Sequence, residues 1–250
     1  MNDLLGLTAP MTAIVVGARG GLGASFAQAL SDSPGVTHVL TTSRDQDWCE
    51  SEPLPSERRV HADLTQERDL EHLAALIPED APLKLVLNCS GLLHAGEVKP
   101  ERTWRELDLE HMRRVFDVNA LGVGLLVKHL VPCMPRRERA LFVSISARVG
   151  SIGDNRLGGW YSYRASKAAQ NMLIKTASVE AARSHPELII AALHPGTVDT
   201  ELSKPFTRRL GPDRLFSPDV SRAHLTEVMR DLTTNDSGGL FAWDGEPIPW

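Results

Sequence analysis

Short runs of aliphatic and β-branched residues alternate along the chain with longer segments in which apolar residues recur at helical spacing. The short runs predict seven strands, at residues 12–16, 38–42, 59–62, 83–87, 140–146, 188–193 and 240–243. The longer segments predict helices at residues 24–30, 67–76, 108–130 and 163–183. This alternation is typical of a doubly wound, mostly parallel sheet with helices on both faces. No linker rich in Pro, Gly or Ser divides the chain, so residues 1–250 are predicted to form one α/β domain.

The segment between the first predicted strand and the first helix is rich in glycine. Gly17, Gly21 and Gly23 have the spacing Gly-x-x-x-Gly-x-Gly, which differs from the commoner Gly-x-Gly-x-x-Gly. Glycines let the backbone turn sharply and approach a pyrophosphate at a helix N-terminus. A nucleotide-binding loop is therefore favoured over a simple tight turn, with predicted contacts from Gly17, Arg19, Gly20, Gly21, Leu22 and Gly23.

The end of the second predicted strand indicates which dinucleotide binds. Ser43 lies 20 residues after Gly23, and Arg44 follows it. An acidic residue near this position would bind the ribose 2′-hydroxyl of NAD, whereas an arginine accommodates the 2′-phosphate of NADP. Arg44, with Arg19 as a second cation, favours NADP(H). The alternative is that Arg44 lies on the surface and Asp45 binds the ribose, which leaves NAD(H) open.

Small and polar residues follow the next two predicted strands, and ligands of such sheets bind at the carboxyl ends of the strands. Asp63 is expected either to cap a helix or to accept a hydrogen bond from the adenine amine, with Leu64 beside it. Asn88, Ser90 and Gly91 follow the fourth strand, where a dinucleotide would pass. These residues extend the predicted cofactor site along the edge of the sheet.

Tyr163 and Lys167 lie four residues apart in a segment predicted to be helical, so both side chains are expected on one helix face. An ammonium beside a phenol stabilises the phenolate and is expected to lower the tyrosine pKa from about 10 toward neutrality. Such a tyrosine can exchange a proton with a substrate oxygen. The spacing alone also fits a surface tyrosine packed on a lysine stem.

Composition excludes some classes of function. The chain has 250 residues, 42% of them hydrophobic, and a formal net charge of −5, so no basic footprint for nucleic acid is expected. No uninterrupted apolar run reaches the roughly 20 residues that cross a bilayer, and no signal peptide is expected. The 3 cysteines are widely spaced, which predicts reduced thiols, no metal site and a cytoplasmic location.

Taken in order, these motifs resemble the short-chain dehydrogenase/reductase family. The resemblance rests on the glycine loop, Asn88-x-x-Gly91, Asn119, Tyr163-x-x-x-Lys167 and Pro195-Gly196, and it covers nearly the whole chain. Further segments resemble the C-factor and carbonyl-reductase-like branch, namely 146–152, 161–167, 194–200 and 243–250. The family has a single-domain Rossmann fold, which the resemblance therefore implies here.

The resemblance also implies roles for individual residues. Tyr163 would be the general acid/base, and Lys167 would lower its pKa and bind the nicotinamide ribose. Asn119 would hold a water that links Lys167 to solvent. Pro195, Gly196 and Val198 would orient the nicotinamide, and Thr200 would contact the cofactor phosphate or the carboxamide.

One position departs from the family pattern. The family carries a catalytic serine after the fifth strand, and in the best register Ala147 takes that position. Ser146 lies one residue earlier and would point to the opposite face of an extended segment. Ser146 is retained as the candidate catalytic hydroxyl; Ser151, a water, or a weak or inactive site are the alternatives.

The predicted function is NADPH-dependent reduction of a small-molecule carbonyl, or the reverse alcohol oxidation. The alternative is a C-factor-like signalling protein that binds NADP(H) with weak or no turnover.

Residues 200–216 are expected to form a lid. Trp160, Phe206 and Leu210 indicate an apolar pocket or, equally, ordinary packing. The resemblance implies a homodimer or homotetramer, although monomeric relatives leave the assembly open.

Overall fold

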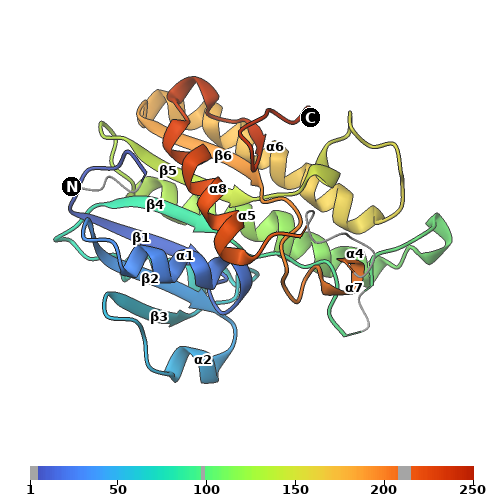
Figure 1. Cartoon of the computed structure of the whole chain (residues 1–250), viewed down its shortest axis with the longest axis horizontal. Helices are drawn as coiled ribbons and strands as arrows, with labels where there is room; N and C mark the ends of the chain where they lie inside the picture. Colours follow the sequence, from blue (N-terminus) through green and yellow to red (C-terminus); the bar gives the residue numbers. More distant parts are fainter. Residues whose placement is uncertain (1–4, 97–98, 208–214) are drawn as a thin grey trace.

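A seven-stranded sheet forms the centre of the molecule, as the computed structural model of the chain shows (Figure 1). The structure describes residues 5–96, 99–207 and 215–250. The strand order is β3-β2-β1-β4-β5-β6-β7, and each neighbouring pair is parallel. The strands are β1 Met11–Val16, β2 Val36–Ser43, β3 Glu57–His61, β4 Leu83–Asn88, β5 Ala140–Ile145, β6 Leu188–His194 and β7 Leu240–Ala242. The seven predicted strands are confirmed, in one doubly wound domain.

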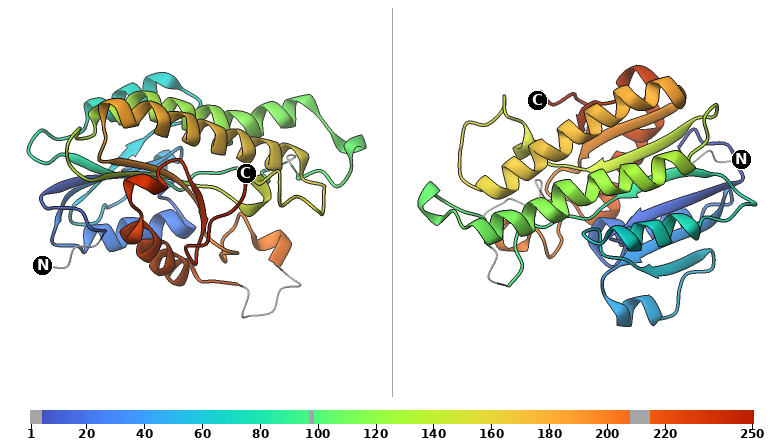
Figure 2. Two further views of the ribbon diagram at one scale, coloured as in Figure 1. Left: turned by 90° about the horizontal axis from the view of Figure 1, so that it is seen from above. Right: turned by 180° about the vertical axis from the view of Figure 1, so that it is seen from behind.

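Helices cover both faces of the sheet (Figure 2). On one face, α1 and α8 pack side chains such as Phe26 and Met229 against the strands. On the other face, Leu70, Leu126 and Ile174 anchor α3, α5 and α6. Strands covered on both sides are buried along their whole length, as β1 and β4 are. The helices are α1 Gly21–Ser31, α2 Gln46–Glu50, α3 Glu67–Ala75, α4 Leu109–Phe116, α5 Gly122–Leu130, α6 Tyr161–Ser184, α7 Lys204–Thr207 and α8 Pro218–Asp231.

The strand order reverses between β1 and β4. From β1 the chain builds outward through β2 to β3 and then crosses back to β4 on the other side of β1. The crossover leaves a crevice at the carboxyl ends of β1 and β4, which is where doubly wound sheets bind their ligands. The glycine loop and residues 89–91 meet at this crevice.

The short helix α2 was not predicted, and two longer helical features also differ from the sequence-based prediction. No helix was predicted at α8, although its start carries clear signals: the Ser217 hydroxyl accepts a hydrogen bond from the Val220 N–H, and Pro218 is the first helical residue. The helix predicted at 108–130 is interrupted by a π-helical segment, Asp117–Leu121. A π-bulge adds a residue to a turn and often marks a functional site.

Taken together, the successive helical segments from Leu109 to Cys133 are long and apolar enough to cross a membrane by length and composition alone. The sequence itself has no uninterrupted apolar run of this length, because a few polar residues are spread through the helix. The mean hydropathy of the helix is nevertheless high enough to meet the criterion. In the structure α5 lies on one face of the sheet (Figure 2). Its Leu126 and Leu130 are fully buried. A core helix of this kind meets the same criterion.

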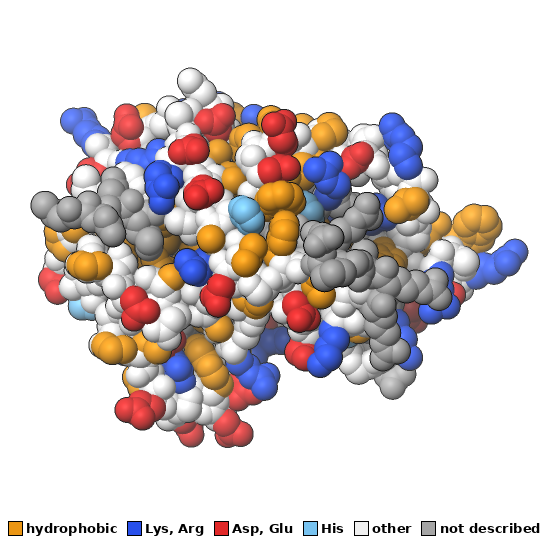
Figure 3. Space-filling view, viewed as in Figure 1, with side chains coloured by type: hydrophobic (Ala, Val, Ile, Leu, Met, Phe, Trp, Pro, Cys, Tyr) orange, Lys and Arg blue, Asp and Glu red, His pale blue; other side chains and the backbone are white. Residues whose placement is uncertain are grey.

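Charges of both signs are interspersed over the face that α1 and α8 form. Figure 3 shows acidic and basic side chains alternating there, without an extended patch of one sign among the described residues drawn. Such a mixed surface gives this face no concentrated field for a polyanion.

Candidate active site

Two adjoining cavities lie along the carboxyl edge of the sheet. The first has a volume of about 230 Å³ and lies beside the ends of β1, β2 and β3. The second has a volume of about 530 Å³ and lies beside the ends of β5 and β6 and the start of α6. Cys89, Ser90 and Gly91 line both cavities, so the two form one elongated site.

The glycine loop forms the turn between β1 and α1. At Gly23 an added Cβ would lie 2.3 Å from the Gly17 carbonyl oxygen, so no larger residue fits this close approach of loop and helix. Gly20 precedes the helix, and no side chain caps the first turn of α1. The uncapped N–H groups and the helix dipole favour an anion there. Gly20, Gly21 and Leu22 line the larger cavity and Gly17 the smaller one, whereas Gly23 lies beneath the loop.

Two arginines line the smaller cavity, Arg19 from the glycine loop and Arg44 from the end of β2, with Ser43 beside them. Asp45, the alternative ribose ligand, has other partners. One of its oxygens accepts a hydrogen bond from the Trp48 N–H at 2.9 Å and caps α2, and the other lies 3.2 Å from Arg19. Asp45 does not line the cavity, whereas Arg44 does. The geometry therefore favours Arg44 over Asp45 as the residue beside the cofactor ribose.

Asp63 and Leu64 line the same cavity, and Asp63 does not cap α3, whose N-cap is Gln66. The Asp63 carboxylate instead accepts hydrogen bonds from the N–H and hydroxyl of Thr65, both at 2.9 Å. Asn88 is buried and lines neither cavity. Its amide donates to the Ser144 hydroxyl at 2.8 Å and accepts from Ser90, so it shapes the loop that passes between the cavities.

Tyr163 and Lys167 both line the larger cavity, one turn apart on α6. The Lys167 ammonium donates to the Ile145 carbonyl at 2.9 Å and to Gln170 Oε1 at 2.8 Å. It lies 5.9 Å from the centre of the Tyr163 ring. Among the described residues no group forms a hydrogen bond with the Tyr163 hydroxyl. The phenol is therefore held in place by packing, with its oxygen available to another molecule.

Burial controls the protonation of this pair. Desolvation raises the pKa of Tyr163 to about 12 and lowers the pKa of Lys167 to about 7. The expectation that Lys167 brings the Tyr163 pKa toward neutrality is wrong for the folded chain, because burial disfavours both charged forms. At neutral pH Tyr163 is a protonated phenol, which suits it to donate a proton.

The segment after β5 contains Ser146 and Ala147, and both line the larger cavity. Ser146 is buried, and its hydroxyl donates to Asn171 Oδ1 on α6 at 2.7 Å. The Asn171 amide nitrogen is buried without a partner among the described residues. Ala147 is extended and follows Ser146, so its methyl group points to the other side. The hydroxyl of Ser146 is thus directed toward α6, and Ser151 lines neither cavity.

Asn119 lies in the π-helical segment and lines neither cavity. Its amide accepts from the Leu92 N–H at 2.7 Å and donates to the Leu92 carbonyl at 2.8 Å and the Ser166 hydroxyl at 3.0 Å. These bonds tie the loop after β4 to α6. Both N–H donors of the side chain are used by protein partners, so a water relay through Asn119 would use its backbone, which the π-bulge displaces.

The segment after β6 forms one wall of the larger cavity with Pro195, Gly196, Val198 and Thr200. Thr200 lies against the glycine loop, because a Cβ added at Gly21 would be 2.7 Å from its methyl group. The two loops therefore close over the crevice from opposite sides. Part of the predicted 200–216 lid forms the short helix α7, while residues 208–214, with Leu210, lie outside the described residues.

An aromatic wall closes the far side of the cavity. The Trp160 ring lies 6.2 Å from that of Tyr163 and 4.9 Å from that of Phe206, both in edge-on geometry. Trp160 has a left-handed backbone with φ 52°, which is rare for a residue with a side chain. Trp160 and Phe206 line the cavity, so the interpretation as pocket residues is favoured over ordinary packing.

Residues 11–211 match the protein family described as short chain dehydrogenase. This chain belongs to that family. The family transfers hydride with a nicotinamide cofactor, so the chain is an NAD(P)-dependent oxidoreductase of this class.

Relatives agree with the branch that the sequence resembles. The chain is 31% identical over 240 residues to a 1-hydroxy-2-glutathionyl-2-methyl-3-butene dehydrogenase of Rhodococcus sp. (strain AD45), covering 96% of this chain and 99% of that protein. It is 33% identical over 147 residues to the C-signal of Myxococcus xanthus, covering 58% of this chain and 82% of that protein. An NADPH-bound carbonyl reductase from chicken fatty liver superposes with a TM-score of 0.83 at 26% identity, covering 99% of this chain and 97% of that chain.

Two residues of this dehydrogenase site, Glu101 and His194, were not predicted from the sequence. Glu101 is buried, and its carboxylate accepts hydrogen bonds from the N–H and hydroxyl of Ser162, while its carbonyl accepts from the Trp160 N–H. It thereby fixes the start of α6, where a carboxylate also complements the helix dipole. His194 ends β6 and lines the cavity, and burial lowers its pKa to about 4. Glu101 belongs to no motif in the sequence, whereas His194 begins the segment 194–200 that resembles the carbonyl-reductase-like branch, although no role was predicted for it.

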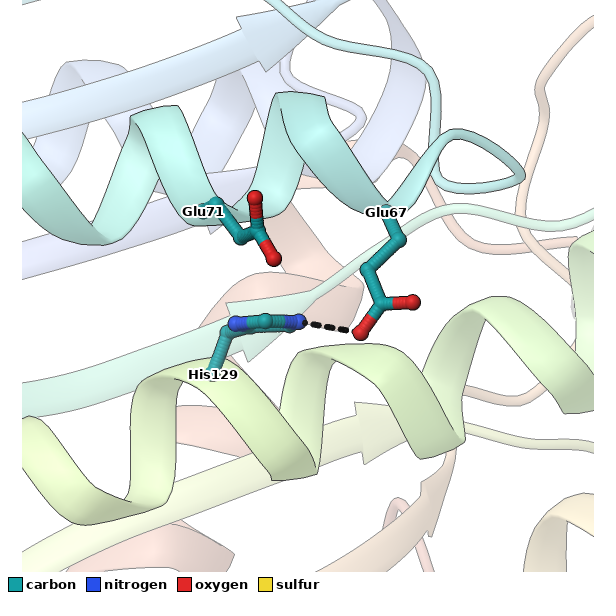
Figure 4. A group of neighbouring side chains, drawn as sticks. All are labelled: Glu67, Glu71 and His129. Carbon is teal, nitrogen blue, oxygen red and sulfur yellow. Dashed lines mark hydrogen bonds and ion pairs between the residues drawn. The ribbon is translucent and has the colours of Figure 1, made fainter.

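Glu67, Glu71 and His129 form a separate cluster between α3 and α5, and none of the three lines either cavity of the site (Figure 4). His129 Nε2 lies 3.0 Å from a Glu67 oxygen, and Lys128 pairs with the same carboxylate. A hydrogen bond from Lys128, and to a lesser degree one from His129, holds the pKa of Glu67 below its usual range. The cluster is a surface ion-pair network that already contains its own cation.

Proposed function

We propose that this short-chain dehydrogenase reduces a small-molecule carbonyl with NADPH, or catalyses the reverse alcohol oxidation, with Tyr163 as the general acid/base. The observation that carries the proposal is the protonated Tyr163 hydroxyl, which lines an aromatic cavity without a described protein partner. That cavity continues into the one lined by Arg19 and Arg44. The proton donor would lie near the reacting carbonyl, and the two arginines would lie near the 2′-phosphate at the other end of NADPH.

The residues present fit a dinucleotide. The uncapped first turn of α1 suits a pyrophosphate, and the close approach at Gly23 keeps the loop low enough to accommodate one. Arg44 and Arg19 would hold a 2′-phosphate, which NAD lacks. The preference for NADP(H) is also supported by the NADPH-bound carbonyl reductase that superposes on this chain.

The chain's own residues would divide the chemistry as follows. When bound, the nicotinamide supplies the hydride that the carbonyl carbon accepts. Tyr163 would give its phenolic proton to the carbonyl oxygen, which completes the alcohol. The Lys167 ammonium is held by the Ile145 carbonyl and Gln170. It would bind the nicotinamide ribose and place a positive charge near the Tyr163 phenol. The segment from Pro195 to Thr200 would orient the reactive ring.

The test is a screen of aldehydes and ketones with NADPH and with NADH. We expect a substrate-dependent loss of reduced-cofactor absorbance that is faster with NADPH at equal concentration. A protein that binds neither cofactor in calorimetry, or that turns over no carbonyl in a broad panel, would contradict the proposed reaction.

A pair of variants tests which group contacts the substrate oxygen. Because the Ser146 hydroxyl is shared with Asn171, we expect Ser146→Ala to lower kcat roughly tenfold, less than the 10²–10³ that losing a full oxyanion donor typically costs. Ala147→Ser places a hydroxyl on the cavity side and should raise kcat by about the same factor. The measurement is steady-state kinetics with the best carbonyl found.

Ser151→Ala is the matched control, since Ser151 lines neither cavity and its hydroxyl accepts a hydrogen bond from the Asp154 N–H. Unchanged kinetics in Ser146→Ala would refute its role. A loss in Ser151→Ala equal to that in Ser146→Ala would transfer the role to the loop.

A second candidate function is cofactor-dependent signalling of the C-factor kind. It is favoured by Ala147 at the position of the family serine and by the match to C-signal. It predicts NADP(H) binding without turnover in the same carbonyl screen. The Ala147→Ser variant then separates the two functions. In an enzyme it should raise turnover, and the gain should disappear when Tyr163 is also replaced by Phe; in a signalling protein it should produce no turnover.

Assembly and location are also proposals. Exposed apolar side chains on the helices α4 to α6 support the homodimer or homotetramer that the family resemblance implies. They are Leu109, Leu121, Met172 and Val179. The three free cysteines are in keeping with a cytoplasmic location, where thiols stay reduced.

A further inference from the structure

A third cavity opens directly beyond the aromatic wall of the active site. It has a volume of about 640 Å³, and Trp160 and Phe206 line both this outer cavity and the one that holds Tyr163. The two spaces therefore meet at this pair of rings. A substrate that reacts at Tyr163 and is longer than the inner cavity would extend past Trp160 into the outer cavity.

The path between the cavities is aromatic and held in place. Ring centres follow one another from Tyr163 to Trp160 at 6.2 Å, from Trp160 to Phe206 at 4.9 Å, and from Phe206 to His94 at 5.8 Å. Glu101 fixes the backbone of Trp160, and His94 Nε2 lies 3.1 Å from the carbonyl oxygens of Glu201 and Leu202. These rings present an apolar surface to whatever lies along them.

The outer cavity has cationic side chains of its own, apart from Arg148 and Lys167 of the inner one. Among the described residues, Lys99 and Arg102 line it, together with the carboxylate of Glu106. That carboxylate already accepts a hydrogen bond from the Arg102 N–H at 2.7 Å. In the parts of the chain that the structure describes, neither Lys99 nor Arg102 pairs with an acidic side chain. Within the described residues, both cations therefore line the cavity without an acidic side-chain partner.

We propose that the outer cavity is an anion subsite, and that the preferred carbonyl substrates have an apolar or aromatic body ending in a carboxylate. The body would lie against Trp160 and Phe206, and the carboxylate would meet Arg102 and Lys99. A guanidinium binds a carboxylate in a two-pronged geometry, and the ammonium adds a second positive charge. This inference rests on the proposed function, since it names the substrate class of the same site.

The test uses two long aldehydes that differ only in charge: a formyl-biphenyl carboxylate and its methyl ester. The double variant Lys99→Gln, Arg102→Gln is expected to lower the ratio of kcat/KM for the acid to that for the ester by about tenfold, as for two exposed ion pairs to one ligand. Glu106→Gln should raise the same ratio a few-fold, because it removes the opposing charge. The ratio in the unmodified protein should also fall as salt is added.

Arg105→Gln is the matched control. Arg105 neighbours the cavity in sequence but does not line it, and its guanidinium lies 6.0 Å from the Trp104 ring. It should leave the ratio as it is. A ratio that does not fall in the double variant, or that falls equally in Arg105→Gln, overturns the anion subsite.

Calorimetry separates this inference from the proposed reaction. Binding of the biphenyl acid to the NADP⁺-loaded Tyr163→Phe protein needs no turnover, and its Kd should rise about tenfold in the double variant. If neither aldehyde is reduced but the acid binds in this charge-dependent way, the reaction fails and the subsite stands. If reduction occurs and the acid and ester bind alike, the subsite fails and the reaction stands.

Discussion

Replacing Tyr163 with phenylalanine is expected to lower the rate of carbonyl reduction by about 10²–10⁴-fold, the usual contribution of a positioned general acid. The ring would still pack against Trp160, so the fold and the cavity should persist. Only the phenolic proton is lost, and the oxygen of the substrate then develops charge without a donor. The measurement is NADPH oxidation with a carbonyl substrate, together with calorimetric binding of NADPH, which should stay near its original affinity.

Tyr161 supplies the control, because it is the other of the 2 tyrosines in the chain and lies in the same helical turn without lining the cavity. Tyr161→Phe should keep its activity. Reduction that survives in Tyr163→Phe at the original rate would rule out Tyr163 as the proton donor.

The direction of the Tyr163 pKa adds a pH signature. Burial raises this pKa to about 12, so the phenol stays protonated as the pH rises from about 6 to 9 and can donate throughout. Alcohol oxidation needs the phenolate, whose fraction grows about tenfold per pH unit below the pKa. The ratio of oxidation to reduction should therefore increase with pH, and in Tyr163→Phe this dependence should disappear.

Replacing Arg44 with leucine is expected to weaken NADPH binding by roughly tenfold to a hundredfold, as for a lost charge-assisted hydrogen bond, and to leave NADH binding nearly unchanged. Arg44 lines the smaller cavity beside Ser43, where a 2′-phosphate would lie. Arg19 has Asp45 as a partner at 3.2 Å, so Arg19→Leu should have the smaller effect. Calorimetric titration of both cofactors measures the change in preference.

Arg58→Leu is the control for this prediction. Arg58 lies on the neighbouring strand β3, is exposed, and does not line the cavity. Equal weakening of NADPH and NADH in Arg44→Leu would mean that Arg44 supports the loop rather than the phosphate. Tighter binding of NADH than of NADPH by the unmodified protein would favour the alternative in which Asp45 binds the ribose.

Some parts of this dehydrogenase follow from local sequence. The positions of Tyr163 and Lys167 on one face depend only on helical periodicity, and the turn at Gly17 to Gly23 depends only on backbone freedom and its place after a strand. Both features are found in the structure as predicted. The start of α8 is also encoded locally, since Ser217 and Pro218 are ordinary helix-start signals.

Other parts could not be read locally. Ser146 was a candidate donor from its position, but its hydroxyl is directed by Asn171, 25 residues away on another element. The expected lowering of the Tyr163 pKa failed because the burial of both side chains outweighs their proximity. Glu101 meets Ser162 across 61 residues, and no spacing rule connects them.

The sequence by itself determined the sheet, the glycine loop and the Tyr163–Lys167 pair, because hydrophobic periodicity and backbone sterics act between near neighbours. The tertiary structure alone decided how deeply that pair is buried, where Ser146 directs its proton, and that an outer cavity with Lys99 and Arg102 opens behind Trp160. Burial, charge and cavity shape arise from segments far apart in the chain, which come together only after the sheet has formed.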